Sequence, residues 1–122
     1  MPEKILIVDD SKINLKVAET LMRPYEFHID TAASGKEALE KVKNTHYDLI
    51  FMDIMMPEMN GVETLYKLRE NEDFTTPVIA LTADALEGTD EKYLNVGFNS
   101  YLSKPIDRKL LNKVINKYLG GK

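Results

Sequence analysis

Short apolar runs alternate with longer amphipathic stretches along the whole chain. The apolar runs predict five β-strands, at residues 4–8, 27–31, 48–52, 77–81 and 98–102. The stretches between and after them have helical periodicity and predict helices at residues 12–23, 35–43, 61–70, 84–96 and 108–119. Strands and helices that alternate in this way predict an α/β fold with a parallel sheet and right-handed crossovers.

Two of the runs indicate how the strands are ordered. The run 48–52 is apolar almost throughout, which is typical of a strand buried on both faces. The run 27–31 is partly polar, and we expect it at an edge of the sheet. These features favour a doubly wound (βα)5 sheet with strand order 2-1-3-4-5 and helices on both faces.

Helix starts and one helix face can also be predicted. Ser, Asn or Asp stands where a capping residue is needed before four of the helices: Ser11, Ser34, Asn60 and Asp107. At 100° per residue four side chains of the first helix share one face, which we expect to contact the sheet: Asn14, Val17, Ala18 and Leu21.

The composition is typical of a soluble globular protein and excludes several kinds of site. The 122 residues, 43% of them hydrophobic and 30% charged, predict one domain over residues 1–122 with no linker. Cysteine is absent, so disulfides, thiolate metal sites and cysteine nucleophiles are excluded. No apolar run or signal pattern indicates a membrane segment, and a net charge of −4 disfavours nucleic acid as a partner. We therefore expect a cytoplasmic protein.

Polar side chains follow four of the predicted strands. Asp9 and Asp10 come after the first strand, Asp53 after the third, Thr82 after the fourth and Lys104 after the fifth. The carboxyl ends of parallel strands meet at one edge of a sheet, where ligands bind in open α/β folds. The sequence therefore predicts one pocket for a divalent cation and a phosphoryl group.

The three carboxylates indicate which cation would bind. Carboxylates that lie close together repel one another unless a cation neutralises them. Mg²⁺ fits best, because it accepts one or two carboxylates, a carbonyl, waters and a phosphate oxygen in octahedral geometry. The alternative is that Asp9 and Asp10 form a polar loop before the first helix.

Asp53, Lys104 and Thr82 are the candidates for chemistry. Asp53 precedes a loop, so we expect its carboxylate to be presented rather than buried, and able to act as a nucleophile that forms an acyl phosphate. Lys104 could neutralise phosphoryl oxygens and Thr82 could donate a hydrogen bond to one. Taken singly, they would read as a surface lysine and a strand-end hydroxyl. Nucleotide binding is not expected, because the glycine-rich phosphate loops are missing.

From Lys4 to Leu119 the chain resembles the receiver domain of two-component response regulators. The resemblance rests on motifs in the family's order and spacing: Asp9-Asp10, Asp53 with Met56-Pro57 and Gly61, Thr82-Ala83 and Lys104-Pro105. It implies a flavodoxin-like fold. The stretches 10–14 and 80–83 look most like receivers of hybrid sensor kinases or phosphorelays, and single-domain receivers are also similar.

The resemblance also implies roles for these residues. Asp53 would take a phosphoryl group from a histidine kinase or a histidine phosphotransfer protein. Asp10, Asp53 and the backbone carbonyl of Met55 would ligate Mg²⁺ directly, while Asp9 would act through water. The switch residues would be Thr82, Ala83 and Tyr101, and the Lys104-Pro105 peptide bond would be cis.

The leading interpretation is therefore a phospho-accepting signalling domain without an output domain, which passes its state to a downstream protein. It would not be an enzyme that acts on a separate substrate. It would catalyse only its own phosphorylation and slow dephosphorylation. A receiver-fold interaction module that needs no phosphate is the alternative. A Mg²⁺-dependent phosphohydrolase is disfavoured, because no separate general acid is evident in the sequence.

Overall fold

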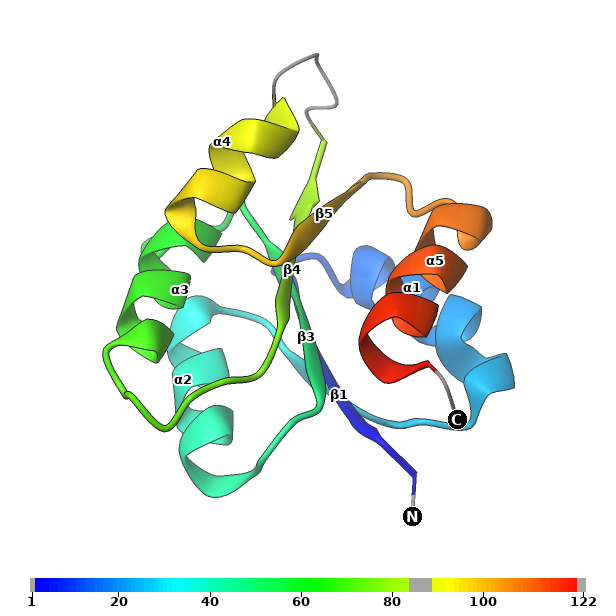
Figure 1. Ribbon diagram of the computed structural model, residues 1–122, viewed down its shortest axis with the longest axis horizontal. Helices are drawn as coiled ribbons and strands as arrows, with labels where there is room; N and C mark the ends of the chain where they lie inside the picture. The colour runs from blue at the N-terminus through cyan, green and yellow to red at the C-terminus, as the bar shows by residue number, and fades with distance from the viewer. Residues whose placement is uncertain (1, 84–88, 121–122) are drawn as a thin grey trace.

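The computed structural model describes residues 2–83 and 89–120 and has a five-stranded parallel sheet at its centre (Figure 1). The strand order is β2-β1-β3-β4-β5, as the sequence predicts. The strands are β1 (Lys4–Val8), β2 (His28–Ala32), β3 (Leu49–Asp53), β4 (Val78–Thr82) and β5 (Ser100–Ser103). The predicted bounds are right to within two residues.

Helices cover both faces of the sheet (Figure 1). On one face lie α1 (Lys12–Met22) and α5 (Arg108–Leu119), and on the other α2 (Gly35–Asn44), α3 (Gly61–Arg69) and α4 (Thr89–Val96). A short 3-10 turn (Arg23–Tyr25) follows α1. The start of the helix predicted at 84–96 lies outside the described residues. Among the helices of the described ranges, none combines the length and the apolar character needed to span a bilayer.

The central strands explain why two separate cores form. Every residue of β3 and β4 is buried, so each strand packs helices against both of its faces. Successive side chains of a strand point to opposite faces. Ile50 and Met52 therefore join the core beneath α2, α3 and α4, while Leu49 and Phe51 join the core beneath α1 and α5.

All four predicted capping residues cap their helices. The side-chain oxygens of Ser11, Ser34, Asn60 and Asp107 each accept a hydrogen bond from a backbone N–H in the first turn. At α3 the cap is reciprocal, because the carboxylate of Glu63 also accepts from the backbone N–H of Asn60 at 3.1 Å. These caps fix where each of the four helices begins, and therefore where the loop before it ends.

The face predicted for α1 is wrong in part. The residues that bury this helix against the sheet are Leu15, Ala18 and Met22, whereas Val17 is 45% exposed. Asn14 and Leu21 are only half-buried. Apolar side chains occur around much of this helix, so a period of 3.6 residues fits two neighbouring stripes equally well. The stripe with the larger side chains, Leu15 and Met22, is the one that packs.

Candidate functional site

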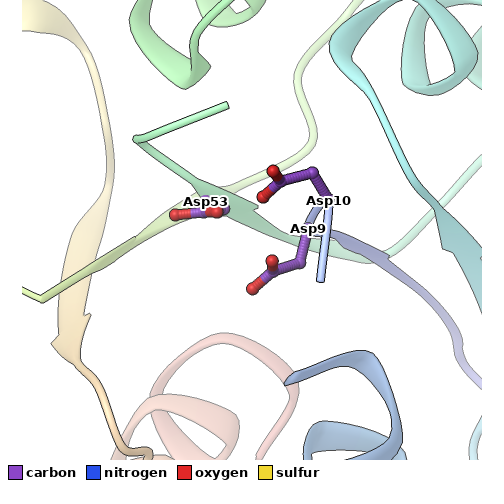
Figure 2. A group of neighbouring side chains, drawn as sticks. All are labelled: Asp9, Asp10 and Asp53. Atoms are coloured by element: carbon purple, nitrogen blue, oxygen red, sulfur yellow. The ribbon is translucent and has the colours of Figure 1, made fainter. Parts of the chain in front are cut away.

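Three carboxylates meet at the carboxyl ends of the neighbouring strands β1 and β3 (Figure 2). Asp9 and Asp10 directly follow β1, and Asp53 is the last residue of the neighbouring strand β3. Ligand oxygens of the three side chains all lie within 4.8 Å of one another. Asp9 and Asp53 are buried and Asp10 is exposed, so the cluster opens to solvent on the side of Asp10.

The carboxylate of Asp53 is more enclosed than the sequence predicts. Its side chain is 4% exposed, which corrects the expectation that it is presented rather than buried. The loop after β3 turns back, and the backbone N–H of Gly61 donates to the carbonyl of Ile54 at 2.9 Å. A Cβ atom on Gly61 would lie 2.4 Å from the carbonyl oxygen of Asp53. Only glycine allows this approach of α3 to the strand end.

Lys104 is part of the pocket and no surface lysine. Its Nζ lies 2.9 Å from Oδ1 of Asp53 and 3.2 Å from Oδ2 of Asp9, with 21% of the side chain exposed. Its backbone N–H donates to the carbonyl of Thr82 at 2.8 Å, which fixes the loop after β5 beside the end of β4. The Lys104-Pro105 peptide bond is cis, as the resemblance implies.

The charges of the pocket oppose one another. Burial raises the pKa of Asp53, and the charge of Asp9 adds to this, while Lys104 and the Met55 N–H only partly offset it. Burial alone would lower the pKa of Lys104, but the hydrogen bonds and charges of Asp53 and Asp9 outweigh it and raise that pKa. Lys104 therefore stays cationic while it neutralises only part of the acidic charge around it.

The donor atoms of the cluster fit a hard divalent cation. Two buried carboxylates and one exposed carboxylate supply oxygen ligands within one small volume, and Mg²⁺ binds through such oxygens while keeping some of its waters. Met55 follows the site directly, with its backbone N–H donating to Oδ1 of Asp53 at 3.2 Å. The donor atoms of this cluster therefore have the chemistry that suits a hard divalent cation such as Mg²⁺.

The remaining predicted residues lie beside the acidic cluster. Thr82 ends β4 and is buried, and Ala83 after it is exposed. Tyr101 lies in β5, half-buried against the core beneath α2, α3 and α4. A second tyrosine, which the sequence does not single out, contacts Thr82: the hydroxyl of Tyr93 in α4 lies 3.3 Å from Oγ1 of Thr82. Helical periodicity would have placed Tyr93 on an inner face, but not against this hydroxyl.

A small cleft opens beside the acidic cluster, between α1 and the loop after β5. Asp9 and Lys104 line it together with Asn14, Val17 and Ile106. Apolar side chains of α1 are exposed on this side, with Val17, which lines the cleft, at 45% and Ile13, next to the lining residue Asn14, at 77%. The cleft gives the acidic cluster an accessible side with apolar surroundings.

Comparison with known proteins identifies the family. The response regulator receiver domain matches residues 5–116, which is nearly the whole chain. Hybrid signal transduction histidine kinase I of Dictyostelium discoideum is 42% identical over 95% of this chain, but the chain spans only 7% of that protein. The polar-differentiation response regulator DivK of Brucella ovis is 36% identical, and the match covers 98% of both chains.

Two solved structures are similar in fold and in sequence. The receiver domain of the sensor histidine kinase PA1611 from Pseudomonas aeruginosa, with magnesium coordinated in its active-site cleft, has a TM-score of 0.88 and 33% identity. The match covers 99% of this chain and all of that one. The receiver domain of Ssk1 from Saccharomyces cerevisiae, crystallised with the histidine phosphotransfer protein Ypd1, has a TM-score of 0.86 and 28% identity, covering 96% of this chain and 88% of that one.

Proposed function

Since this chain belongs to the response regulator receiver domain family, we propose that Asp53 accepts a phosphoryl group from a phosphohistidine donor. The observation that carries this proposal is the pairing of Asp53 with Lys104 at 2.9 Å inside a cluster of three carboxylates. A buried carboxylate held by a single lysine beside two further acids is poorly placed for stability and well placed for a phosphoryl group and a cation.

The proposed transfer is a displacement at phosphorus. An oxygen of the Asp53 carboxylate attacks the phosphorus of phosphohistidine, an O–P bond forms and the N–P bond breaks. The leaving imidazole nitrogen keeps the electron pair and is neutralised by a proton. Lys104 reaches Asp53 already and would neutralise the charge that develops on the phosphoryl oxygens.

We assign the metal site to the same cluster. Asp10, Asp53 and the backbone carbonyl of Met55 would hold Mg²⁺ directly, with Asp9 acting through water. When bound, the cation would supply positive charge to the phosphoryl oxygens. The exposed position of Asp10 supports this assignment, because a ligand on the open side leaves room for the waters that Mg²⁺ retains.

Phosphorylation would change the surface around β5 and α4. The phosphoryl group adds about 0.5–1 unit of negative charge to that of the carboxylate. Thr82, which follows Leu81 opposite Asp53 in the sheet, would donate a hydrogen bond to it. Ala83 is small enough to leave the path open, and Tyr101 would move further inward as Thr82 turns, so that a downstream protein reads the altered face.

The donor would be a histidine kinase or a histidine phosphotransfer protein. The exposed apolar side chains of Ile13 and Val17 on α1, beside the cleft that Asp9 and Lys104 line, support docking of a protein on this side. Such a partner would bring its phosphohistidine to Asp53 without crossing the sheet.

Intact mass spectrometry tests the proposal without knowledge of the natural donor. The wild type is incubated with acetyl phosphate and Mg²⁺, next to Asp53→Asn, in which a nearly isosteric amide replaces the nucleophile. We expect one added phosphoryl group on the wild type and none on the variant. A wild type that stays unmodified, or a variant that is modified to the same level, would contradict the proposal.

A further inference from the structure

A buried hydroxyl pair links α4 to the pocket. The hydroxyl of Tyr93 lies 3.3 Å from Oγ1 of Thr82, and both residues are at most 5% exposed. Water has little access to either group, so each depends on protein partners for its hydrogen bonds. This contact is a polar link between α4 and Thr82, which directly follows Leu81, the residue opposite Asp53 in the sheet.

The Tyr93 ring is anchored independently of its hydroxyl. It packs edge-on against Phe98 with ring centroids 6.1 Å apart, inside the core that Tyr101 also contacts. Nζ of Lys92 lies over the ring, 5.8 Å from its centroid. The ring position is therefore set by packing, and the hydroxyl is available for the contact with Thr82.

We propose that Tyr93 is a latch that holds Thr82 in the unphosphorylated arrangement. The proposal rests on the proposed function, in which Thr82 hydrogen-bonds a phosphoryl group on Asp53. The Thr82 side chain can turn toward the phosphoryl group only if it gives up its geometry with Tyr93. The bond to Tyr93 therefore stabilises the unphosphorylated state and couples any rotation of Thr82 to α4.

The latch and Tyr101 act at different points. Tyr101 lies opposite Ala80 in the sheet, two pairs before the end of the strand, and packs against the core from β5. Tyr93 reaches the same face from α4 and contacts the hydroxyl of Thr82 itself. Release of Thr82 would thus reach α4 directly through Tyr93, by a contact that does not involve Tyr101.

Tyr93→Phe tests the latch, because it keeps the ring and removes only the hydroxyl. The probe is beryllofluoride with Mg²⁺, titrated by NMR. We expect the variant to bind beryllofluoride roughly three- to tenfold more tightly, since losing one buried hydrogen bond destabilises the unphosphorylated state alone. Tyr66→Phe, on the exposed side of α3, is the matched control and should bind as the wild type does.

A double-mutant cycle separates the latch from a packing effect. In a Thr82→Ala background the Tyr93 hydroxyl has no Oγ1 to contact, so Tyr93→Phe should no longer change beryllofluoride affinity. A gain that persists there would overturn the latch, as would unchanged or weaker binding by Tyr93→Phe in the wild-type background.

Two measurements on the wild type distinguish a failure of the latch from poor folding of the variant and from a failure of the proposed function. In the wild type, the ¹³Cζ resonance of Tyr93 should shift when beryllofluoride binds, because its hydroxyl loses Thr82; a resonance that does not shift would overturn the latch even if the variant folds poorly. A wild type that binds no beryllofluoride would instead overturn the proposed function on which the latch rests.

Discussion

The two ends of the sheet treat buried polar groups in opposite ways. Before β3, the Tyr47 hydroxyl donates to Asp30 at 2.6 Å, and the Tyr47 carbonyl accepts from the hydroxyl of Thr76 at 2.8 Å. After β3, the carboxylates of Asp9 and Asp53 instead share the ammonium of Lys104. Donors match acceptors at the amino end, whereas acids outnumber cations at the carboxyl end. The first arrangement stabilises the fold, and the second leaves charge for a ligand to neutralise.

The pKa shifts of Tyr47 and Asp53 differ in their consequences, as do the contacts at the two ends of the sheet. Burial raises the pKa of Tyr47, and the hydrogen bond and charge of Asp30 raise it further, so the phenol stays neutral and remains a donor. Burial and a neighbouring acid raise the pKa of Asp53, which shows that its ionised form is held at a cost in stability. Substitutions at the two ends should therefore differ in sign as well as in size.

The largest effect is expected at the amino end. Tyr47→Ala removes a fully buried ring and leaves a cavity, so the free energy of unfolding should fall by ~3–5 kcal/mol. Urea unfolding measures it, with Tyr47→Phe as a control that loses only the hydroxyl and ~1 kcal/mol. The folded fraction of Tyr47→Ala should still accept a phosphoryl group. If folded Tyr47→Ala no longer accepted a phosphoryl group, the two ends of the sheet would not have separate roles.

Lys104→Ala should have the next largest effect, and its size should depend on metal. Without Mg²⁺ the variant leaves two buried carboxylates without their shared cation, and we expect unfolding to require ~2 kcal/mol less. Saturating Mg²⁺ should recover most of that loss. Lys109→Ala, on the exposed side of α5, is the matched control and should change stability by less than ~0.5 kcal/mol.

The same Lys104 variant tests coupling to the switch. It should still accept some phosphoryl group, but beryllofluoride should no longer shift the NMR resonances of Thr82, Ala83 and Tyr101. Shifts like those of the wild type would mean that Lys104 is not the coupling residue.

Asp10→Ala should weaken Mg²⁺ binding by about tenfold or more, because it removes a ligand together with part of the electrostatic attraction. NMR titration with MgCl₂ measures the affinity. Asp73→Ala changes the net charge equally at an exposed position and should bind Mg²⁺ as the wild type does. Equal affinities for the two variants would remove Asp10 from the metal site.

Asp53→Asn should give the smallest effect on stability, with the opposite sign. Without metal at neutral pH, the variant should be more stable than the wild type by ~1 kcal/mol. Because the folded pKa of Asp53 is raised above its ordinary value of 3.8, the wild type loses stability as pH rises through that folded pKa. The advantage of the variant should therefore grow from pH 4 upward, measured by urea unfolding. An advantage that is flat with pH would contradict this sign.

The fold follows closely from the sequence, because its signals are local. Apolar runs locate the strands, and the side-chain oxygens of residues such as Ser34 and Asn60 start the helices where predicted. The face of α1 that packs on the sheet does not follow from the sequence. Stripes of helical period run through Val17 and through Leu15, and only packing against the sheet selects the stripe of Leu15. Helical periodicity alone does not tell which of the two stripes packs against the sheet.

The sequence predicts which residues form the site, but not how deeply their side chains are buried. The order of strand ends brings Asp9, Asp53 and Lys104 together, as expected from a parallel sheet. The burial of Asp53 depends on how closely Gly61 lets α3 approach, which is a tertiary contact. The contact of Tyr93 with Thr82 likewise joins a helix to a strand end, and no local pattern encodes it.

Of the three crowded carboxylates, we propose that Asp53 is the one that accepts the phosphoryl group. Borohydride reduction after treatment with acetyl phosphate and Mg²⁺ converts an aspartyl phosphate to homoserine, which peptide mass spectrometry can locate. We expect homoserine at position 53 in the wild type and at no other acidic residue. Homoserine at position 9 or 10, or none at position 53 in protein that has gained a phosphoryl group, would contradict it.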